Sequence, residues 1–158
     1  MQFQISDSDA MHDFGQRLGQ ALVGGDIVVL DGPLGAGKTT LVQGIGLGLD
    51  VAGSITSPTF VVSRIHRAGE RGIGLIHVDA YRLKTATDLL DMEVDDQPNS
   101  VLVLEWGRPF VEALSSRWLD VSIARDDYGS DEDPASGQRT LVINSHGPDW
   151  DHVLKALS

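Results

Sequence analysis

Apolar residues along the chain follow two patterns: recurrence at helical spacing, and short continuous runs typical of buried strands. Near the start of the chain, apolar residues at helical spacing follow three residues, 6–8, whose side-chain oxygens can cap a helix. They are Met11, Phe14, Leu18 and Leu22. The pattern predicts an amphipathic helix to about residue 23, where two glycines end it.

The rest of the chain alternates between predicted strands and predicted helices. Apolar or alternating runs predict strands at residues 26–30, 59–66, 73–79, 100–106, 119–124 and 140–144. Helical spacing predicts helices at residues 40–49, from a Thr85 or Thr87 cap to about 92, at 109–119, and around Trp150, Val153, Leu154 and Leu157. Three glycines in the second helix each cost about 1 kcal/mol relative to alanine, so this helix needs close packing, which we expect against the sheet.

This order of elements predicts an α/β fold. We expect a P-loop NTPase-like, three-layer arrangement with a mixed, largely parallel central sheet flanked by helices. The chain has 158 residues, which is a common size for one domain, so residues 1–158 are predicted to form a single domain.

A complete phosphate-binding motif lies between the first predicted buried strand and the second predicted helix. Residues 32–39 read G-P-L-G-A-G-K-T, which matches Gly, four residues, Gly, Lys and Ser or Thr. Glycines let the backbone N–H groups of such a loop turn inward, and the helix that follows adds the positive end of its dipole. We call residues 32–39 the glycine-rich loop; it predicts a nucleotide phosphate site.

The last two residues of the glycine-rich loop have distinct predicted roles. Lys38 is expected to reach the β- and γ-phosphate oxygens, and the hydroxyl of Thr39 is expected to coordinate Mg²⁺. Two predicted strands carry a carboxylate at their carboxyl end, Asp79 in one and Glu105 in the other. Because ligands of open α/β sheets bind beyond the carboxyl ends of the strands, both acids should converge on the loop, and at least one should serve Mg²⁺ or water.

Composition narrows the class of protein. The net charge of −11 disfavours direct binding of bare nucleic acid. The chain has no cysteine, and it shows no leader-like or membrane-spanning apolar segment, so we expect a soluble, cytoplasmic protein without disulfides. His66 and His77 have no partners at metal-ligand spacing and are interpreted as structural or surface residues. An acidic segment at residues 125–138 is interpreted as a solvated loop.

Four ordered motifs resemble the TsaE family, the bacterial P-loop ATPases of tRNA threonylcarbamoyladenosine (t6A) biosynthesis. They are G-P-L-G-A-G-K-T-T at 32–40, I-T-S-P-T-F at 55–60, H-V-D-A-Y-R-L at 77–83 and L-E-W-G at 104–107. The resemblance implies an ATPase with weak activity alone, whose turnover is coupled to the complex of TsaB and TsaD. In this reading tRNA is met only through that complex.

The resemblance also implies roles for individual residues. Glu105 would be the second Mg²⁺ ligand, Asp79 would position the attacking water, and residues 56–59 would form a switch-like loop. The residues implied to contact ATP are Gly35, Ala36, Gly37, Lys38, Thr39, Thr40, Thr59 and Trp106. This sequence departs from the family pattern at Pro33, at Arg108-Pro109 and near Met11, so the contacts of the adenosine are not assigned.

Three other functions are compatible with a glycine-rich loop of this kind. A small-molecule kinase would need a basic cluster to hold its acceptor, whereas Arg108, Arg117 and Arg125 are scattered in the sequence. A GTPase would carry an N-K-x-D motif, which is absent. A regulator that binds ATP without hydrolysing it stays open, although Lys38 and the two carboxylates favour hydrolysis.

Overall fold

The structure is a computed structural model in which residues 1–55, 63–92, 98–125 and 137–158 are described. In this part of the chain seven strands form one sheet, in the order β1-β7-β6-β2-β5-β4-β3. The strands are β1 (Gln2–Ile5), β2 (Ile27–Asp31), β3 (Ser63–His66), β4 (Gly74–Asp79), β5 (Ser100–Glu105), β6 (Trp118–Arg125) and β7 (Arg139–His146).

The sheet is parallel in its centre and antiparallel at both sides. Strand β2 pairs in parallel with β5 and β6, and β5 pairs in parallel with β4. Strands β1, β7 and β3 make the antiparallel pairs. The predicted mixed sheet is therefore confirmed, and three of its parallel strands, β2, β4 and β5, bring their carboxyl ends to the same edge.

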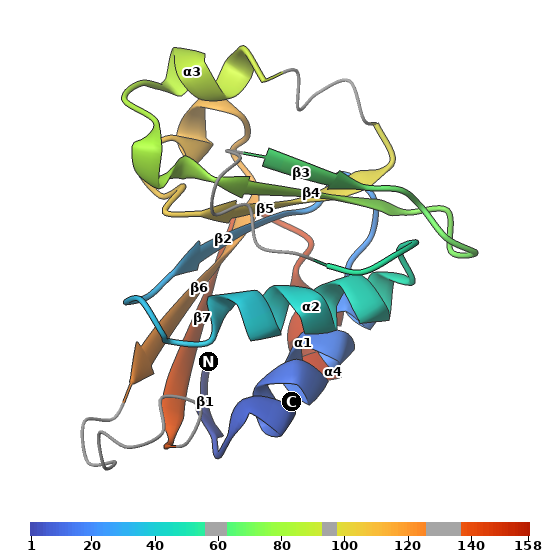
Figure 1. Cartoon of the computed structure of the whole chain (residues 1–158), viewed down its shortest axis with the longest axis vertical. Helices are drawn as coiled ribbons and strands as arrows, with labels where there is room; N and C mark the ends of the chain where they lie inside the picture. The colour runs from blue at the N-terminus through green and yellow to red at the C-terminus, as the bar shows by residue number, and fades with distance from the viewer. Residues whose placement is uncertain (56–62, 93–97, 126–136) are drawn as a thin grey trace.

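Helices cover both faces of this sheet, which confirms the predicted three-layer arrangement (Figure 1). One face carries α1, α2 and α4 with the larger apolar cluster, and the other carries α3 and the 3-10 turn η3 with a smaller cluster. The helices and 3-10 turns are α1 (Ser8–Ala21), α2 (Lys38–Leu49), η1 (Ala80–Arg82), α3 (Ala86–Leu90), η3 (Val111–Ala113) and α4 (Asp151–Leu157).

One predicted helix is wrong, and one strand of the sheet was not predicted. The helix predicted at residues 109–119 is only the short turn η3. Its continuation is blocked because the Ser115 hydroxyl accepts the N–H of Arg117 and donates to the carbonyl of the same residue, which turns the chain into β6. Strand β1 was not predicted, because four residues with alternating Gln side chains give a weak signal and its partner residues 139–142 lie at the far end of the sequence.

Two of the three glycines of α2, Gly44 and Gly48, approach another helix and not the sheet. A Cβ built on Gly44 would lie 2.2 Å from the carbonyl oxygen of His12, and one on Gly48 would lie 2.2 Å from that of Gln16. The facing glycine of α1, Gly15, is equally restricted by α2. Packing of α2 on the sheet was therefore the wrong expectation for Gly44 and Gly48: they let α1 and α2 meet backbone to backbone.

Arg71, in the turn between β3 and β4, fastens the ends of these two helices. Its guanidinium donates to the carbonyls of Gly19 at 3.0 Å and Leu22 at 3.1 Å, at the end of α1, and to that of Gly48 at 2.7 Å in α2. Carbonyls at a helix end lack intrahelical partners and carry the negative end of the dipole, so one cation stabilises both helices.

Replacing Arg71 with methionine, which keeps an apolar stem, is expected to lower the free energy of unfolding by about 1.5–3 kcal/mol. The reason is the loss of charge-assisted bonds to carbonyls of two helices. Urea unfolding followed by circular dichroism measures the change. Arg67→Met is the matched control, because that side chain is exposed in the same hairpin; equal losses in both variants would contradict the proposed role of Arg71.

Candidate nucleotide site

The glycine-rich loop joins β2 to α2 at the carboxyl edge of the sheet. Gly35 and Gly37 adopt positive φ angles of 77° and 103°, a region that side chains other than glycine rarely enter. Gly37 is also the residue that precedes α2, and no side chain caps that helix. The first N–H groups of α2 thus have no side-chain partner, which is the arrangement that binds phosphate at a helix start.

Lys38 lies on the glycine-rich loop itself. Its Nζ donates to the carbonyl oxygen of Gly32, lies 3.4 Å from that of Pro33, and is 4.5 Å from the centre of the Trp106 ring. The ammonium group is thus held beside the loop by uncharged partners. A phosphate oxygen would be a stronger acceptor than a neutral carbonyl, so Lys38 can exchange partners there.

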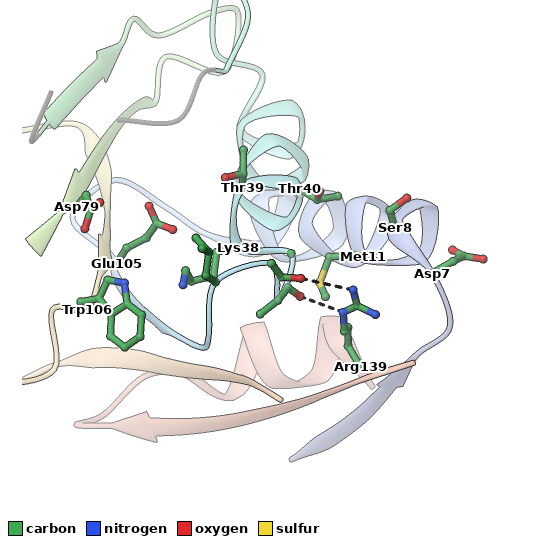
Figure 2. Close-up of a pocket in the computed structure, with 14 residues that line it drawn as sticks. Asp7, Ser8, Met11, Lys38, Thr39, Thr40, Asp79, Glu105, Trp106 and Arg139 are labelled. Carbon is green, nitrogen blue, oxygen red and sulfur yellow. Dashed lines mark hydrogen bonds between the residues drawn. The ribbon is translucent and has the colours of Figure 1, made fainter. Parts of the chain in front are cut away.

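Asp79 and Glu105 end neighbouring parallel strands and are partners in register. Both line the same cleft as Lys38 and Thr39, which bears out the expected convergence of these side chains (Figure 2). An oxygen of Asp79 accepts the N–H of Tyr81 at 3.0 Å. Glu105 is only 6% exposed.

Trp106 follows Glu105 in a strained backbone conformation. Its φ angle is +59°, which is uncommon for a bulky residue, and its N–H donates to the carbonyl of Leu30 at 3.0 Å. The ring lies beside Lys38 and 5.7 Å from the ring of Tyr81. This conformation turns the indole toward the glycine-rich loop (Figure 2).

The cleft has a volume of about 520 Å³ and extends beyond the residues expected from the sequence. Four of its lining residues were not predicted: Asp7, Ser8, Met11 and Arg139. The first three begin α1, and Arg139 begins β7, where Nε lies 3.4 Å from the carbonyl oxygen of Ala36. Pairing of β7 with β6 and of β1 with β7 brings these distant segments to the loop, and no local pattern in the sequence indicates that pairing.

The remaining predicted site residues divide into two groups. Gly35, Ala36, Gly37 and Thr40 line the cleft with the residues described above. Thr59, with the whole predicted switch-like segment 56–59, lies outside the described residues, as does most of the acidic loop.

The two strand histidines are buried, which excludes the surface interpretation for both. His77 contacts Glu105 through Nε2, at 2.9 Å. The sequence offered one sign that His77 lies near the site. Residues two apart on a strand share a face, and His77 precedes Asp79 by two.

Comparison with known proteins identifies the family. A family model described as "Threonylcarbamoyl adenosine biosynthesis protein TsaE" matches residues 5–133. The chain belongs to the TsaE family. A relative from Mycobacterium tuberculosis (strain H37Rv), named as a tRNA threonylcarbamoyladenosine biosynthesis protein TsaE, is 48% identical over 120 residues, covering 70% of this chain and 71% of the relative. A TsaE from Streptomyces coelicolor is 43% identical over 142 residues, covering 89% and 93%.

A solved structure resembles the TsaE-family fold of this chain. It is the crystal structure of Bacillus subtilis YdiB, with a TM-score of 0.76 and 21% identity, covering 99% of this chain and 93% of that one. This likeness supports the same overall fold.

Arg108, one of the residues at which this TsaE chain departs from the family pattern, is part of a network of ion pairs. Its guanidinium makes two bonds to Asp120, at 2.8 and 2.6 Å, and one to Asp31 at 2.9 Å. The bond to Asp120 and the nearby acids raise the pKa of Arg108 against a smaller effect of burial. Arg108 therefore ties the segment after Glu105 to β6 and to the residue that precedes the glycine-rich loop.

None of the helices in the described residues of this TsaE chain has both the length and the apolar character that crossing a bilayer requires. Within the same residues, no three or more His, Cys, Asp or Glu side chains are grouped so as to hold a metal ion.

His66 gives the stability of the TsaE fold a predicted pH dependence. Burial first, and then the charges of His77 and Arg64, lower the pKa of His66 from 6.5. As the pH falls through about 6.5, the unfolded chain therefore takes up a proton that the folded chain resists, and stability is lost. When the pH is lowered from about 7.5 to about 5.5, the melting temperature of the parent protein should fall. In His66→Asn this fall is expected to be smaller by about 2 °C.

Thermal unfolding at both pH values measures this effect. His152→Asn is the control, since that histidine is exposed on α4. An equal loss of melting temperature in the parent protein and in His66→Asn would show that His66 does not contribute.

Proposed function

We propose that this protein hydrolyses ATP with Mg²⁺ during t6A modification of tRNA, and that its turnover is coupled to a complex of TsaB and TsaD. The observation that carries the proposal is one cleft lined by the glycine-rich loop, the uncapped start of α2 and two carboxylates from adjacent strands. Family membership supports the pathway. In this proposal tRNA is met through the protein complex, in keeping with the net charge of −11.

The chemistry of the cleft residues fits Mg²⁺. Thr39 and Glu105 offer oxygen ligands, and Mg²⁺ is commonly bound by one or two carboxylates together with substrate phosphates and not by a cage of protein groups. This agrees with the lack of a larger metal-ligating cluster among the described residues. When bound, Mg²⁺ would supply charge neutralisation on the phosphates.

The protein's own groups would do the rest. Backbone N–H groups of residues 35–40 would bind the phosphates, with the start of α2 contributing its dipole. Lys38 would leave the Gly32 carbonyl for the β- and γ-phosphate oxygens, where negative charge develops during transfer. Asp79 would orient the attacking water with the oxygen that does not accept the N–H of Tyr81. Trp106 would close one side of the site.

The opposite end of the cleft is proposed to hold the nucleoside. Met11 offers a polarisable apolar surface to a base, and its terminal carbon would lie 3.3 Å from a Cβ on Gly37. Ser8 and Arg139 supply polar groups at that end of the cleft. This assignment orients ATP along the cleft, with its γ-phosphate toward Asp79 and Glu105.

The surroundings of two arginines argue against the small-molecule kinase alternative. Arg108 is bound to Asp120 and Asp31, and Arg117 is bound to the buried Asp26 at 2.6 Å. Each is therefore engaged by carboxylates, so neither stands ready to hold a phosphorylated acceptor. Water is the acceptor we propose.

The test is Mg²⁺-dependent phosphate release from ATP by the chain alone and with TsaB and TsaD. We expect partner stimulation that is lost in Asp79→Asn, which keeps the oxygen that accepts from Tyr81, and in Glu105→Gln. Exposed acids supply the matched controls Asp91→Asn and Glu112→Gln. A rate of ATP hydrolysis that is the same with and without TsaB and TsaD, or that is unchanged in Asp79→Asn, would contradict the proposal.

A further inference from the structure

A buried hydrogen bond lies behind the carboxylate at the end of β5. The Nε2 atom of His77, on β4, is 2.9 Å from Oε2 of Glu105. His77 is completely buried, and Glu105 is 6% exposed. A polar contact withdrawn from water in this way is held in a fixed geometry and is costly to leave unmade.

The direction of this bond follows from the chemistry of its atoms. A carboxylate oxygen accepts, so Nε2 of His77 must carry the hydrogen and donate it. The other ring nitrogen, Nδ1, has no hydrogen-bond partner among the residues that the structure describes. Within those residues, the imidazole therefore has a single polar contact, and that contact is Glu105.

Packing alone does not account for an imidazole at this position. Its neighbours on the same face of the sheet, Leu75 and Val103, are fully buried apolar residues of the larger core cluster. An aliphatic side chain would fill such a place without burying an unpartnered nitrogen. The polar ring thus costs stability and gives one orientation-specific contact in return.

Strand register explains how that contact reaches the cleft. Asp79 pairs with Glu105, and His77 pairs with Val103, so the histidine lies two residues behind Asp79 on the same strand and diagonal to Glu105 on one face. Its bond occupies Oε2. The remaining oxygen of Glu105, Oε1, has no protein partner in the described part of the chain, and Glu105 lines the cleft.

We propose that His77 is a positioning residue that fixes the carboxylate of Glu105 so that Oε1 is presented to Mg²⁺ in the nucleotide complex. The inference rests on the proposed function, in which Glu105 is a ligand of that ion. Groups behind a metal ligand restrict its orientation, and their removal commonly costs about 10- to 100-fold in metal affinity. His77 itself touches neither nucleotide nor metal in this proposal.

Two amide substitutions separate positioning from packing. In His77→Gln the side-chain nitrogen reaches about as far as Nε2, whereas in His77→Asn it is one carbon shorter and stops short of Glu105. Both side chains are polar and uncharged, so their burial costs are similar. If His77 positions Glu105, the longer donor of His77→Gln should preserve this positioning, and the shorter donor of His77→Asn should not.

The readout is ADP affinity by calorimetry, measured with Mg²⁺ and with EDTA. In the parent protein Mg²⁺ is expected to strengthen ADP binding. In His77→Asn this gain should fall about 10- to 100-fold while affinity in EDTA stays within about twofold, and His77→Gln should recover most of the gain. If His77→Asn fails to fold, His77→Leu takes its place with the same expectation.

Several outcomes would overturn the inference. The full Mg²⁺ gain in His77→Asn would show that the contact does not position Glu105. Equal losses in the Gln and Asn variants, or a loss of affinity in EDTA, would indicate a role in packing only. If Mg²⁺ did not strengthen ADP binding in the parent protein, the proposed role of Glu105 as a Mg²⁺ ligand would be contradicted. The inference about His77, which rests on that role, would then be contradicted as well.

Discussion

Replacing Lys38 with alanine is expected to lower the rate of ATP hydrolysis, measured with TsaB and TsaD present, by about a hundred- to a thousandfold. Its ammonium group sits at the mouth of the glycine-rich loop, bonded to the Gly32 carbonyl and close to the Trp106 ring. In the proposed reaction no other described lysine lines the cleft to take its place. The variant therefore loses the positive charge at the point where the γ-phosphate gains negative charge.

Phosphate release and ADP affinity should be measured together for this variant. Lys84→Ala, which removes an exposed lysine away from the cleft, is the matched control and should keep its activity. The melting temperature shows whether loss of the bond to Gly32 disturbs the loop. Turnover within about threefold of the parent protein in Lys38→Ala would exclude transition-state stabilisation by this residue.

The second large effect concerns the stability of the fold, at the contact between α1 and α2. Gly44→Ala is expected to lower the free energy of unfolding by about 2–3 kcal/mol. The new Cβ would lie 2.2 Å from the His12 carbonyl oxygen, a backbone atom that moves only if a helix moves. Since α2 begins with Lys38 and Thr39, a displaced helix should also weaken ADP binding.

Gly46→Ala in the same helix provides the matched comparison. There the added Cβ would meet Cδ1 and Cγ1 of Ile55 at 2.7 and 2.8 Å, which are side-chain atoms that a rotation of Ile55 can move without moving a helix. Alanine also gains about 1 kcal/mol of helix propensity, so the free energy of unfolding should change by less than about 1 kcal/mol. Urea unfolding of both variants decides the matter; equal losses would show that helix contact is not the limiting factor at Gly44.

The centre of the fold could be predicted from the sequence because its signals are local. The buried runs that form β2, β4 and β5 are continuous and apolar, and the glycine-rich loop between β2 and α2 has fixed spacing. The edges could not be predicted in the same way. Strand β1 depends on residues 139–142, and the missed break before β6 depends on the Ser115 hydroxyl.

The same distinction applies to the candidate site. Lys38, Thr39, Asp79 and Glu105 follow from a motif and from strand ends, and all four line the cleft. The opposite end of the cleft needs tertiary contacts: Met11 and Arg139 arrive from segments that are far apart in the sequence. Partnership between His77 and Glu105 likewise depends on which strands are neighbours, which spacing along one strand does not reveal.

The pairing of β1 with β7 has a consequence for biosynthesis. Residues 2–5 leave the ribosome well before their partners at 139–142, which follow about 140 residues later. At roughly 5–20 residues per second, the first strand waits about 7–30 s for its place in the sheet. Late in this interval, once residues 118–125 have been made, β6 also lacks its antiparallel neighbour. A nascent chain that stalls late in translation should therefore expose sheet edges, which makes this interval the one in which aggregation or chaperone capture is most expected.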